Sequence, residues 1–469
     1  MSTRRLIYLP IFFLLLTFCR EVIEVPEPPE EPSLPSGTSF LEASAQRSGD
    51  VSAGYDYLVN GDYVGAGIPL EIFKNVFGDD PENVLNRTGD NATLAPGFTA
   101  VTADNGVKMA AANCLQCHGQ KLQGQFVVGL GNSLGDFTQD QSELVPALDF
   151  GIDFFYGQNS PEKEAYQPFR RALLATAKHL VMESAGVNPA DKLAAVLAAH
   201  RDAASLTWLD SPQVNLPLDV VPTDVPAWWL LKKKHAMFYN GVGQGDFARI
   251  MMASSLLTME DSAEAREVDQ NFENVLSYIL SLDAPAYPGS IDQTLAATGQ
   301  QIFAANCQSC HGTYGDSVSY PNLLVSLDRV GTDPLLASSY FSETALVDWY
   351  NQSWFSQSPF AAALVPGDGY VAPPLDGIWA TAPYLHNASV PDLESLLNSS
   401  TRPTFWKRSF DDQDYRLDVP GWNYTEESAQ ADVQTYNTTL VGYGNQGHTF
   451  GDNLTGEQRT ALIEYLKTL

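Results

Sequence analysis

The sequence is poor in cysteine and in basic residues, and both shortages limit what the chain can be. Its 469 residues include five cysteines, and 26 lysines and arginines stand against 56 aspartates and glutamates. The formal net charge of −30 repels the phosphate backbone of nucleic acids, so we exclude a nucleic-acid partner. The same charge favours a basic partner protein, although an adaptation to salt or for solubility would give the same composition.

Long apolar runs are also missing, except at the beginning of the chain. Two arginines precede the apolar run 6–18, which is short for a membrane span and contains a proline. This pattern is typical of an export signal, so we leave residues 1–19 out of the expected fold. An acidic, proline-rich stretch then opens the segment 20–49, which we expect to be an extended tether.

These features predict a protein of the bacterial cell envelope. A cysteine after an apolar run and before a flexible tether resembles a bacterial lipoprotein signal, in which Cys19 would carry a lipid. Export without a lipid is the alternative. The protein would then be periplasmic or lipid-anchored, with a lipid at Cys19 as its only attachment to the membrane, or it would be secreted.

The other four cysteines form two short motifs of one kind. CLQCH occupies Cys114–His118, and CQSCH occupies Cys307–His311. The two thiols of such a motif can form thioethers with the vinyl groups of a haem, and the adjacent imidazole can bind the iron. We therefore predict two covalently bound haem c groups, with His118 and His311 as the proximal iron ligands. The thioether bonds would form at Cys114, Cys117, Cys307 and Cys310.

Two other uses of paired cysteines agree less well with the sequence. A thioredoxin-like dithiol does not need a histidine after both motifs. A four-cysteine zinc site would have to join cysteine pairs from opposite halves of the chain. Beyond Cys19, no cysteine is left for a structural disulfide, so haem attachment accounts for all of the remaining thiols.

The two motifs divide the chain into two units of similar plan. We expect a first haem domain over 50–283 and a second over 290–469, with the breaker-rich segment between them as a hinge. Each domain is expected to close on an amphipathic helix, at 263–282 in the first and 457–469 in the second. Thr455 is suited to cap the second of these helices.

Helices are also expected immediately before the motifs, at 299–307 and, by analogy, at 109–114. This order of helix, motif and closing helix resembles the cytochrome c fold. We therefore predict a mainly α protein with two cytochrome c-like haem domains in tandem. The alanine-rich region 142–200 would enlarge the first domain by a helical insertion that either shapes a pocket or supports the core.

The second haem has no methionine available within its own domain, because none follows Met259. This argues against the methionine–histidine ligation that raises the potential of many cytochromes. We favour His448 as the distal ligand, because the glycines around it would let the backbone approach a flat macrocycle. A loop histidine without a metal is the alternative. A haem with two histidine ligands would suit electron transfer rather than substrate binding.

For the first haem we assign no distal ligand and predict an open or weakly held position. An exogenous molecule could reach the iron at such a position, so chemistry is expected there. None of the available side chains stands in a distinctive sequence context. They are His179, His200, His235, Met182, Met237, Met251 and Met252.

One long segment is more specific than the motifs. Residues 373–397, PPLDGIWATAPYLHNASVPDLESLL, resemble a signature of the bacterial di-haem cytochrome c peroxidase and MauG superfamily. Together with 447–451 and the closing helix, they are most similar to the branch that contains rubber oxygenase A. The resemblance implies that the N-terminal haem is the reaction site and that the C-terminal haem, with two histidine ligands, stores or relays an electron.

The resemblance also implies roles for individual residues. Trp228 or Trp229 would lie between the haems as a relay, and the alternative is a buried aromatic pair in the core. His386 matches a family histidine that lies near the haem interface and is not an axial ligand. Calcium between the domains is implied by the resemblance alone. The missing distal methionine departs from the peroxidase type, and Ala388 stands where the family usually has glycine.

We therefore expect an oxidoreductase in which peroxide or dioxygen binds the iron opposite His118. The haem held by His311 and His448 would supply or accept an electron, and a basic redox protein would be the partner. One alternative is a non-catalytic, di-haem electron-transfer cytochrome with both irons six-coordinate. Another is an envelope protein that is stabilised by haem and has no redox role.

Overall fold

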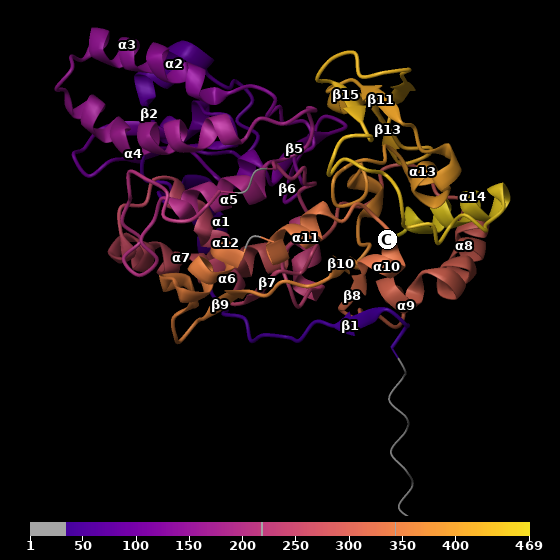
Figure 1. Ribbon diagram of the computed structural model, residues 1–469. Coiled ribbons are helices and arrows are strands. Elements are labelled where there is room, and N and C mark those ends of the chain that lie inside the picture. Colours follow the sequence, from indigo (N-terminus) through magenta and orange to yellow (C-terminus); the bar gives the residue numbers. More distant parts are fainter. Residues whose placement is uncertain (1–33, 217–218, 343) are drawn as a thin grey trace, which may run out of the picture. The chain divides into compact units, whose positions relative to one another are not determined.

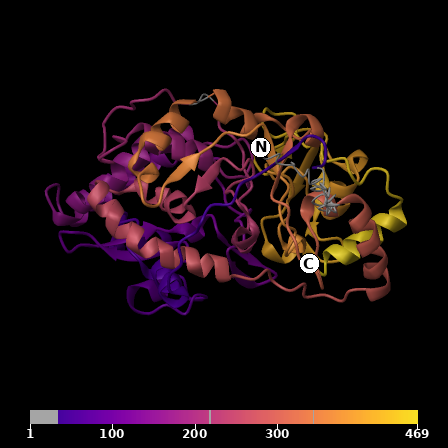
Figure 2. The same cartoon turned by 90° about the horizontal axis from the view of Figure 1, so that it is seen from below.

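Two pairs of crossed helices organise the chain, one pair in each half (Figure 1). Helix α1 (Val51–Asn60) packs against α7 (Ser262–Ser281), and α8 (Gln293–Asn306) packs against α14 (Gly456–Leu466). Figure 2 shows α8 and α14 side by side in a second view. Both predicted closing helices, α7 and α14, are confirmed, and so is the helix before the second motif, α8.

Each helix pair crosses at a glycine. A β-carbon on Gly54 would lie 1.9 Å from the carbonyl oxygen of Asn274 in α7. A β-carbon on Gly299 would lie 1.9 Å from the carbonyl oxygen of Ala461 in α14. Because any side chain would force the backbones apart, only glycine allows these crossings. An aromatic pair accompanies each crossing, Tyr55 with Tyr278 and Phe303 with Tyr465.

The structure, a computed structural model, describes residues 34–216, 219–342 and 344–469. Within these residues, Ser36–Leu469 form one compact unit. Cys19, the expected export signal and the first part of the expected tether lie outside the described residues. In the part of the chain that is described, no helix is both long and apolar enough to span a bilayer.

The region 142–200 is largely helical, as predicted. It contains α3 (Val145–Phe155), α4 (Pro161–Thr176) and α5 (Ala190–Ala199). Helix α4 begins where a serine side chain accepts a hydrogen bond from the third helical N–H and a proline occupies the first helical position. Both are favourable signals for a helix start.

The run before the first motif is a strand and not the predicted helix. Strand β4 (Lys108–Ala112) pairs antiparallel with β3 (Phe98–Thr102) over its full length and with β2 (Ile68–Pro69) on its other side. Pairing on both edges outweighs the helical preference of alanine. Gly67 packs directly on Ala110 of β4, where a β-carbon would come within 2.0 Å of the carbonyl oxygen. The helical partner of α7 is therefore α1, which lies well before the motif.

Strands from the two halves of the chain pair with each other. Strand β8 (Leu323–Ser326) lies between β1 (Thr38–Phe40) and β10 (Gly369–Val371), and β7 (Gly243–Gly245) pairs with β9 (Ala362–Leu364). The β7–β9 pair thus interlocks the two expected domains, in addition to the irregular segment that follows α7. Residues 38–40, which were expected to be part of the tether, belong to the folded unit as strand β1.

The remaining elements are short. The helices are α2 (Leu70–Phe77), α6 (Phe247–Met252), α9 (Gln308–His311), α10 (Leu327–Val330), α11 (Leu335–Ser342), α12 (Thr344–Gln352) and α13 (Leu393–Leu397). The strands are β5 (Gly119–Leu122), β6 (Gln125–Val128), β11 (Phe405–Arg408), β12 (Tyr415–Arg416), β13 (Gly421–Trp422), β14 (Tyr424–Glu426) and β15 (Thr435–Asn437). Helix accounts for 40% of the residues and strand for 14%, so the mainly helical class is confirmed.

The predicted cap of α14 is also present. The hydroxyl of Thr455 accepts a hydrogen bond from the Gln458 N–H at 3.2 Å, and the Gln458 side chain accepts one from the Thr455 N–H at 2.8 Å. This reciprocal capping box satisfies two donors at the helix start.

The crossing of α8 and α14 gives a first prediction. Gly299→Ala should destabilise the protein by about 2–4 kcal/mol, because the new methyl group meets a backbone carbonyl that cannot move aside. Chemical denaturation of the purified, haem-loaded protein measures this. Gly151→Ala is the matched control, since Gly151 lies inside α3 with no atom within 4 Å of its β-carbon position. That variant should gain about 0.5–1 kcal/mol. Equal stability of the two variants would contradict the crossing.

Candidate functional site

The second motif lies where α8 ends, and its histidine is fixed by a carbonyl group. Cys307 caps the C-terminus of α8, and α9 carries the motif to His311. The Nδ1 atom of His311 lies 2.8 Å from the carbonyl oxygen of Pro373. Because a carbonyl only accepts, the proton is on Nδ1, and Nε2 is left free to bind a metal. Burial lowers the pKa of His311 and keeps the imidazole neutral, which is the form that binds metals.

The ring of His448 faces the ring of His311. Their centroids are 6.3 Å apart, and their planes meet at 63°. The Nδ1 atom of His448 is buried without a hydrogen-bond partner in the described chain, and burial lowers the pKa of this histidine to about 3. Two imidazoles that bind one metal from opposite sides, each at about 2 Å, have ring centres roughly 6 Å apart. The pair therefore fits the two axial positions of a haem iron.

The glycines around His448 pack closely against the backbone of neighbouring segments. A β-carbon on Gly447 would lie 2.2 Å from the carbonyl carbon of Gly331, and one on Gly451 would lie 2.4 Å from the carbonyl oxygen of Leu397. These glycines let the loop pack against the backbone of the protein itself. They hold the loop in place, and the expectation that they also allow close approach to a macrocycle stays a prediction.

The first motif begins with a short 3-10 turn, Cys114–Gln116, and its cysteines and histidine are partly buried. The backbone N–H of Cys114 donates to the hydroxyl of Tyr63 at 3.1 Å, and the Asn188 amide donates to the sulfur of Cys117 at 3.1 Å. The ring of His118 stacks on Trp228, with 4.5 Å between centroids and 19° between planes. Burial lowers the pKa of His118 to about 3, so this imidazole is neutral too.

The two proximal histidines differ at Nδ1. In His311 this atom donates to a carbonyl, whereas in His118 it is buried and has no hydrogen-bond partner in the described chain. A hydrogen bond at the second nitrogen fixes the ring and makes an imidazole a stronger donor to metal. His118 is held by stacking instead, so its imidazole would be the weaker donor to a metal of the two.

The four thiols are free, and their surroundings do not favour thiolates. Burial raises the pKa of Cys114 and of Cys117, and it raises the pKa of Cys307 to about 11. A dithiol redox site needs the opposite shift. Among the described residues, no three His, Cys, Asp or Glu side chains gather closely enough to hold a metal ion, so neither the alternative zinc site nor a cluster of acidic calcium ligands is seen there.

The histidines considered as distal ligands of the first haem are engaged elsewhere or lie near the surface. His200 stacks on Trp208 and places its Nδ1 2.9 Å from the carbonyl oxygen of Leu209. The Nδ1 of His235 lies 2.8 Å from the carbonyl oxygen of Leu41, and His179 is half-buried at the end of α4. Among the methionines, Met182 and Met252 are buried in apolar clusters, while Met237 and Met251 are partly buried.

The tryptophan pair reaches toward both motifs. Trp228 stacks on His118, and its backbone N–H donates to the carbonyl of Gly129 at 2.8 Å. The indole N–H of Trp229 donates to the carbonyl oxygen of Asp376 at 2.8 Å. Asp376 lies three residues after Pro373, which holds His311. Two consecutive residues thus contact the proximal histidine of one motif and the segment that anchors the other.

His386 is buried but does not face a proximal histidine. Its ring stacks on Tyr370 at 4.1 Å and 16°, and its carbonyl accepts a hydrogen bond from the Asp224 N–H at 2.7 Å. Burial lowers the pKa of His386 to about 3. Nearby, Ala388 has a φ of 57°, which is a left-handed conformation that favours glycine. This explains why the resembling family places glycine at that position.

One titratable group beside the first motif has no sequence signal. Asp224 is half-buried and accepts a hydrogen bond from the hydroxyl of Tyr239, and desolvation raises its pKa to about 7. The preceding residue, Thr223, pairs with Asn188, whose side chain touches the sulfur of Cys117. The surrounding sequence is an ordinary turn, so only the fold reveals this carboxyl group.

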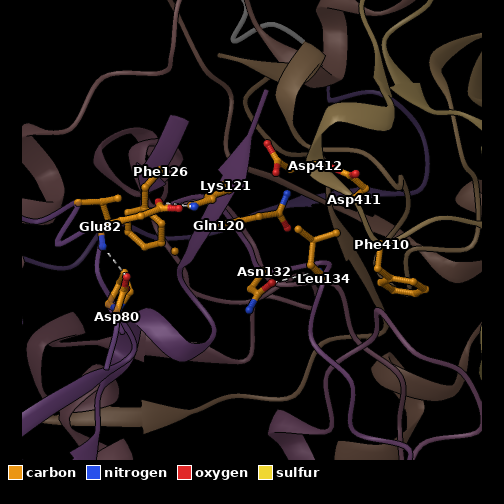
Figure 3. Close-up of a pocket in the computed structure, with 13 residues that line it drawn as sticks. Asp80, Glu82, Gln120, Lys121, Phe126, Asn132, Leu134, Phe410, Asp411 and Asp412 are labelled. Atoms are coloured by element: carbon orange, nitrogen blue, oxygen red, sulfur yellow. Dashed lines mark hydrogen bonds and ion pairs between the residues drawn. The ribbon is translucent and has the colours of Figure 1, made fainter. Parts of the chain in front are cut away.

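A cavity of about 600 Å³ lies beside the first motif (Figure 3). Its wall includes Gln120 and Asn132, and the backbone N–H of Asn132 donates to the carbonyl of Cys117 at 2.8 Å. Lys121 at the wall is paired with one of the surrounding carboxylates, Glu82. The lining is strongly acidic, and its carboxylates come from both halves of the chain. They are Asp80, Glu82, Asp411 and Asp412.

Two protein-family models match the second half of the chain. A family described as cytochrome c matches residues 296–350, which include the second motif. A family described as RoxA-like, cytochrome c-like matches residues 369–407, which include Pro373 and His386. The chain contains cytochrome c-like domains. They imply covalently bound haem c and a haem-based redox or electron-transfer function. The first motif lies outside both matches.

Two relatives come from Sinorhizobium fredii. The uncharacterized protein y4iM is 25% identical over 304 residues, which is 57% of this chain and 69% of the relative. The uncharacterized protein y4iJ is 30% identical over 253 residues, which is 40% of this chain and 41% of the relative. Neither name describes an activity. The family matches support the cytochrome c and RoxA-like part of the resemblance, and the relation to MauG stays a prediction.

The half-buried carboxyl group predicts a pH dependence of stability. Because burial raises the pKa of Asp224 to about 7, the folded protein keeps a proton that the unfolded chain releases near pH 4. Stability contributed by this group is therefore lost as the pH rises from about 4 to about 7. Asp224→Asn should abolish this loss and stabilise the protein above pH 7 by about 2–4 kcal/mol.

Denaturant unfolding at a series of pH values measures this effect. Asp104→Asn is the control, because Asp104 is exposed. This variant should change the free energy of unfolding little at any pH, so its dependence of stability on pH should match that of the wild type. If the curves of wild type and Asp224→Asn run parallel between pH 4 and 8, Asp224 is not the titrating group.

Proposed function

We propose that the protein is a di-haem c-type oxidoreductase of the bacterial cell envelope. In this proposal, peroxide or dioxygen reacts at the haem of Cys114–His118, and the haem of Cys307–His311 relays electrons. The observation that carries the proposal is the position of His448 opposite His311. Because two imidazoles would close both axial positions of the second iron, the first site is the one left to small molecules.

The residues of the chain would hold the two proposed haems in different ways. At the second site, the carbonyl of Pro373 orients His311 from behind, and His448 approaches from the other side. At the first site, His118 is oriented by Trp228 and lacks a carbonyl partner. When bound, haem supplies one-electron redox chemistry and an iron position that peroxide or dioxygen can occupy.

A route of stacked rings, covalent bonds and hydrogen bonds between the two sites supports the proposed relay. It runs from His118 through the stacked ring of Trp228 to the adjacent Trp229, whose indole donates to Asp376. From Asp376 the chain leads back to Pro373 and its bond to His311. The simpler role of a buried aromatic pair would not require contacts with both sites.

A proton source also lies beside the first site. Reduction of peroxide or dioxygen consumes protons, and an acid works best when its pKa is close to the ambient pH. Asp224, with its pKa raised to about 7 and its carboxylate bonded to Tyr239, meets this condition. It is connected to Cys117 through Thr223 and Asn188.

The acidic cavity beside the first motif supports a basic redox protein as the partner. Carboxylates from both halves of the chain line it, and the chain as a whole carries a net charge of −30. Such a field attracts and orients a positively charged partner. The envelope location in this proposal depends on the expected export signal, with a lipid at Cys19 as the only proposed attachment to a membrane.

Purified protein from a haem-attaching host tests the proposal. Intact mass should show two haems in the wild type and one in each of the variants Cys114→Ala/Cys117→Ala and Cys307→Ala/Cys310→Ala. Absorption and paramagnetic resonance spectra should then be followed during reduction and after addition of peroxide, dioxygen or cyanide. In oxidised or half-reduced wild type, one haem should accept a ligand while the other stays low-spin.

The variants show which haem reacts. Loss of the second haem should leave a ligand-accepting site, and loss of the first should leave only the low-spin haem. Two low-spin haems that bind none of the three molecules in any redox state would exclude the enzyme and favour the electron-transfer cytochrome. Absence of reversible reduction would favour a purely structural role.

A single substitution tests the ligand assignment. His448→Ala should convert the second haem from low-spin to high-spin, because no other side chain in the described structure faces His311 in this way. His386→Gln is the control and should leave the second haem low-spin, since His386 stacks on Tyr370 instead. A low-spin second haem in His448→Ala would move the assignment to another residue.

A further inference from the structure

Arg402 directs its whole guanidinium group at backbone carbonyls. Its five N–H groups have five carbonyl acceptors, and no carboxylate is among them. Two of the acceptors belong to α13, and three belong to the loop that carries His448. They are Ser395 at 2.9 Å, Leu396 at 3.0 Å, Asn445 at 2.6 Å, Gly447 at 2.6 Å and His448 at 3.2 Å.

The loop needs such a partner because its backbone is strained. Gly447 and His448 are consecutive left-handed residues, with φ of 76° and 45°. This conformation is unfavourable for histidine and persists only where the surroundings enforce it. The loop lies outside regular secondary structure, so its carbonyl groups must find hydrogen-bond donors from elsewhere in the chain. On its other side, the His448 N–H donates to the carbonyl of Val330 at 2.7 Å.

We propose that Arg402 is a positioning residue for His448. By binding the carbonyl groups of Gly447 and His448 together, it fixes the backbone from which the imidazole projects toward His311. The other arm of the same guanidinium is attached to α13, so the loop is held to a helix rather than to another loop. This inference rests on the proposed role of His448 as an iron ligand.

The arrangement requires arginine in particular. A guanidinium is a planar fork with five donors in fixed directions, and here every donor is used. A lysine has three donors on one nitrogen and cannot bind carbonyls from α13 and from the loop in the same geometry. Arg402→Lys therefore keeps the charge and removes the positioning, whereas Arg402→Gln removes both.

Purified, haem-loaded full-length protein provides the test. In Arg402→Gln and Arg402→Lys, a large fraction of the second haem should become high-spin, and added imidazole should return it to the low-spin state. The backbone amide hydrogen of His448 should exchange with solvent about tenfold faster or more. Without Arg402, the loop can open without breaking the hydrogen bonds to the guanidinium, so opening is more frequent. The exchange measurement does not depend on activity and is applicable to a variant that binds haem poorly.

Arg459→Gln is the matched control. Arg459 also binds α13, through an ion pair with Glu394 at 2.8 Å, but its other side-chain contact is the carbonyl of Leu454, six residues after His448. This variant should keep a low-spin second haem and the wild-type exchange rate at His448. A change equal to that in Arg402→Gln would indicate general loosening of α13 and would overturn the inference.

Two further outcomes separate the inference from the proposed function. Wild-type spectra and exchange in both Arg402 variants, together with a high-spin haem in His448→Ala, would overturn the role of Arg402 alone. A low-spin second haem in His448→Ala would instead overturn the ligand assignment on which the inference rests. Should Arg402→Gln fail to fold, Arg402→Lys answers the same question.

Discussion

The hydrogen bond from His311 to the carbonyl of Pro373 is the interaction on which the second site depends. It connects the motif at the end of α8 to the start of the segment that the RoxA-like family matches. Tyr314 makes the same connection a second time, because its hydroxyl donates to the His311 carbonyl at 3.1 Å and accepts the Leu375 N–H at 2.6 Å. With the ring of His311 fixed in this way, only one direction is left from which a second ligand can approach.

The same short segment joins the second site to the first half of the chain. The backbone carbonyl of Asp376 accepts the indole N–H of Trp229, and its carboxylate pairs with Lys233 at 2.7 Å. Residues 373–376 therefore connect the two sites. The carbonyl of Pro373 binds His311, and the carbonyl of Asp376 binds Trp229, the neighbour of Trp228. The first site is built differently, since His118 relies on the face of Trp228 for its orientation.

Much of this arrangement is accessible from the sequence, because it depends on local patterns. The two motifs, the helices α7, α8 and α14, and the Thr455 cap are encoded in short stretches of chain. His448 was favoured by elimination, since the methionines end at Met259 and few histidines remain. The strand β4 was missed because its alanines prefer a helix, and only pairing with β3 overrides that preference. Asp224 and Arg402 were missed for a related reason, because no local pattern marks them. The Tyr239 hydroxyl is 15 residues from Asp224, and the Gly447 carbonyl is 45 residues from Arg402.

The strand pairs between the halves affect how the protein can be made. Strand β1 pairs with β8, and β7 pairs with β9, so more than a hundred residues must be synthesised after the first strand of each pair before either ladder can close. Contacts of such long range close slowly. Both cysteine pairs lie between β1 and β8 in the sequence, so this ladder can close only after both pairs have been synthesised.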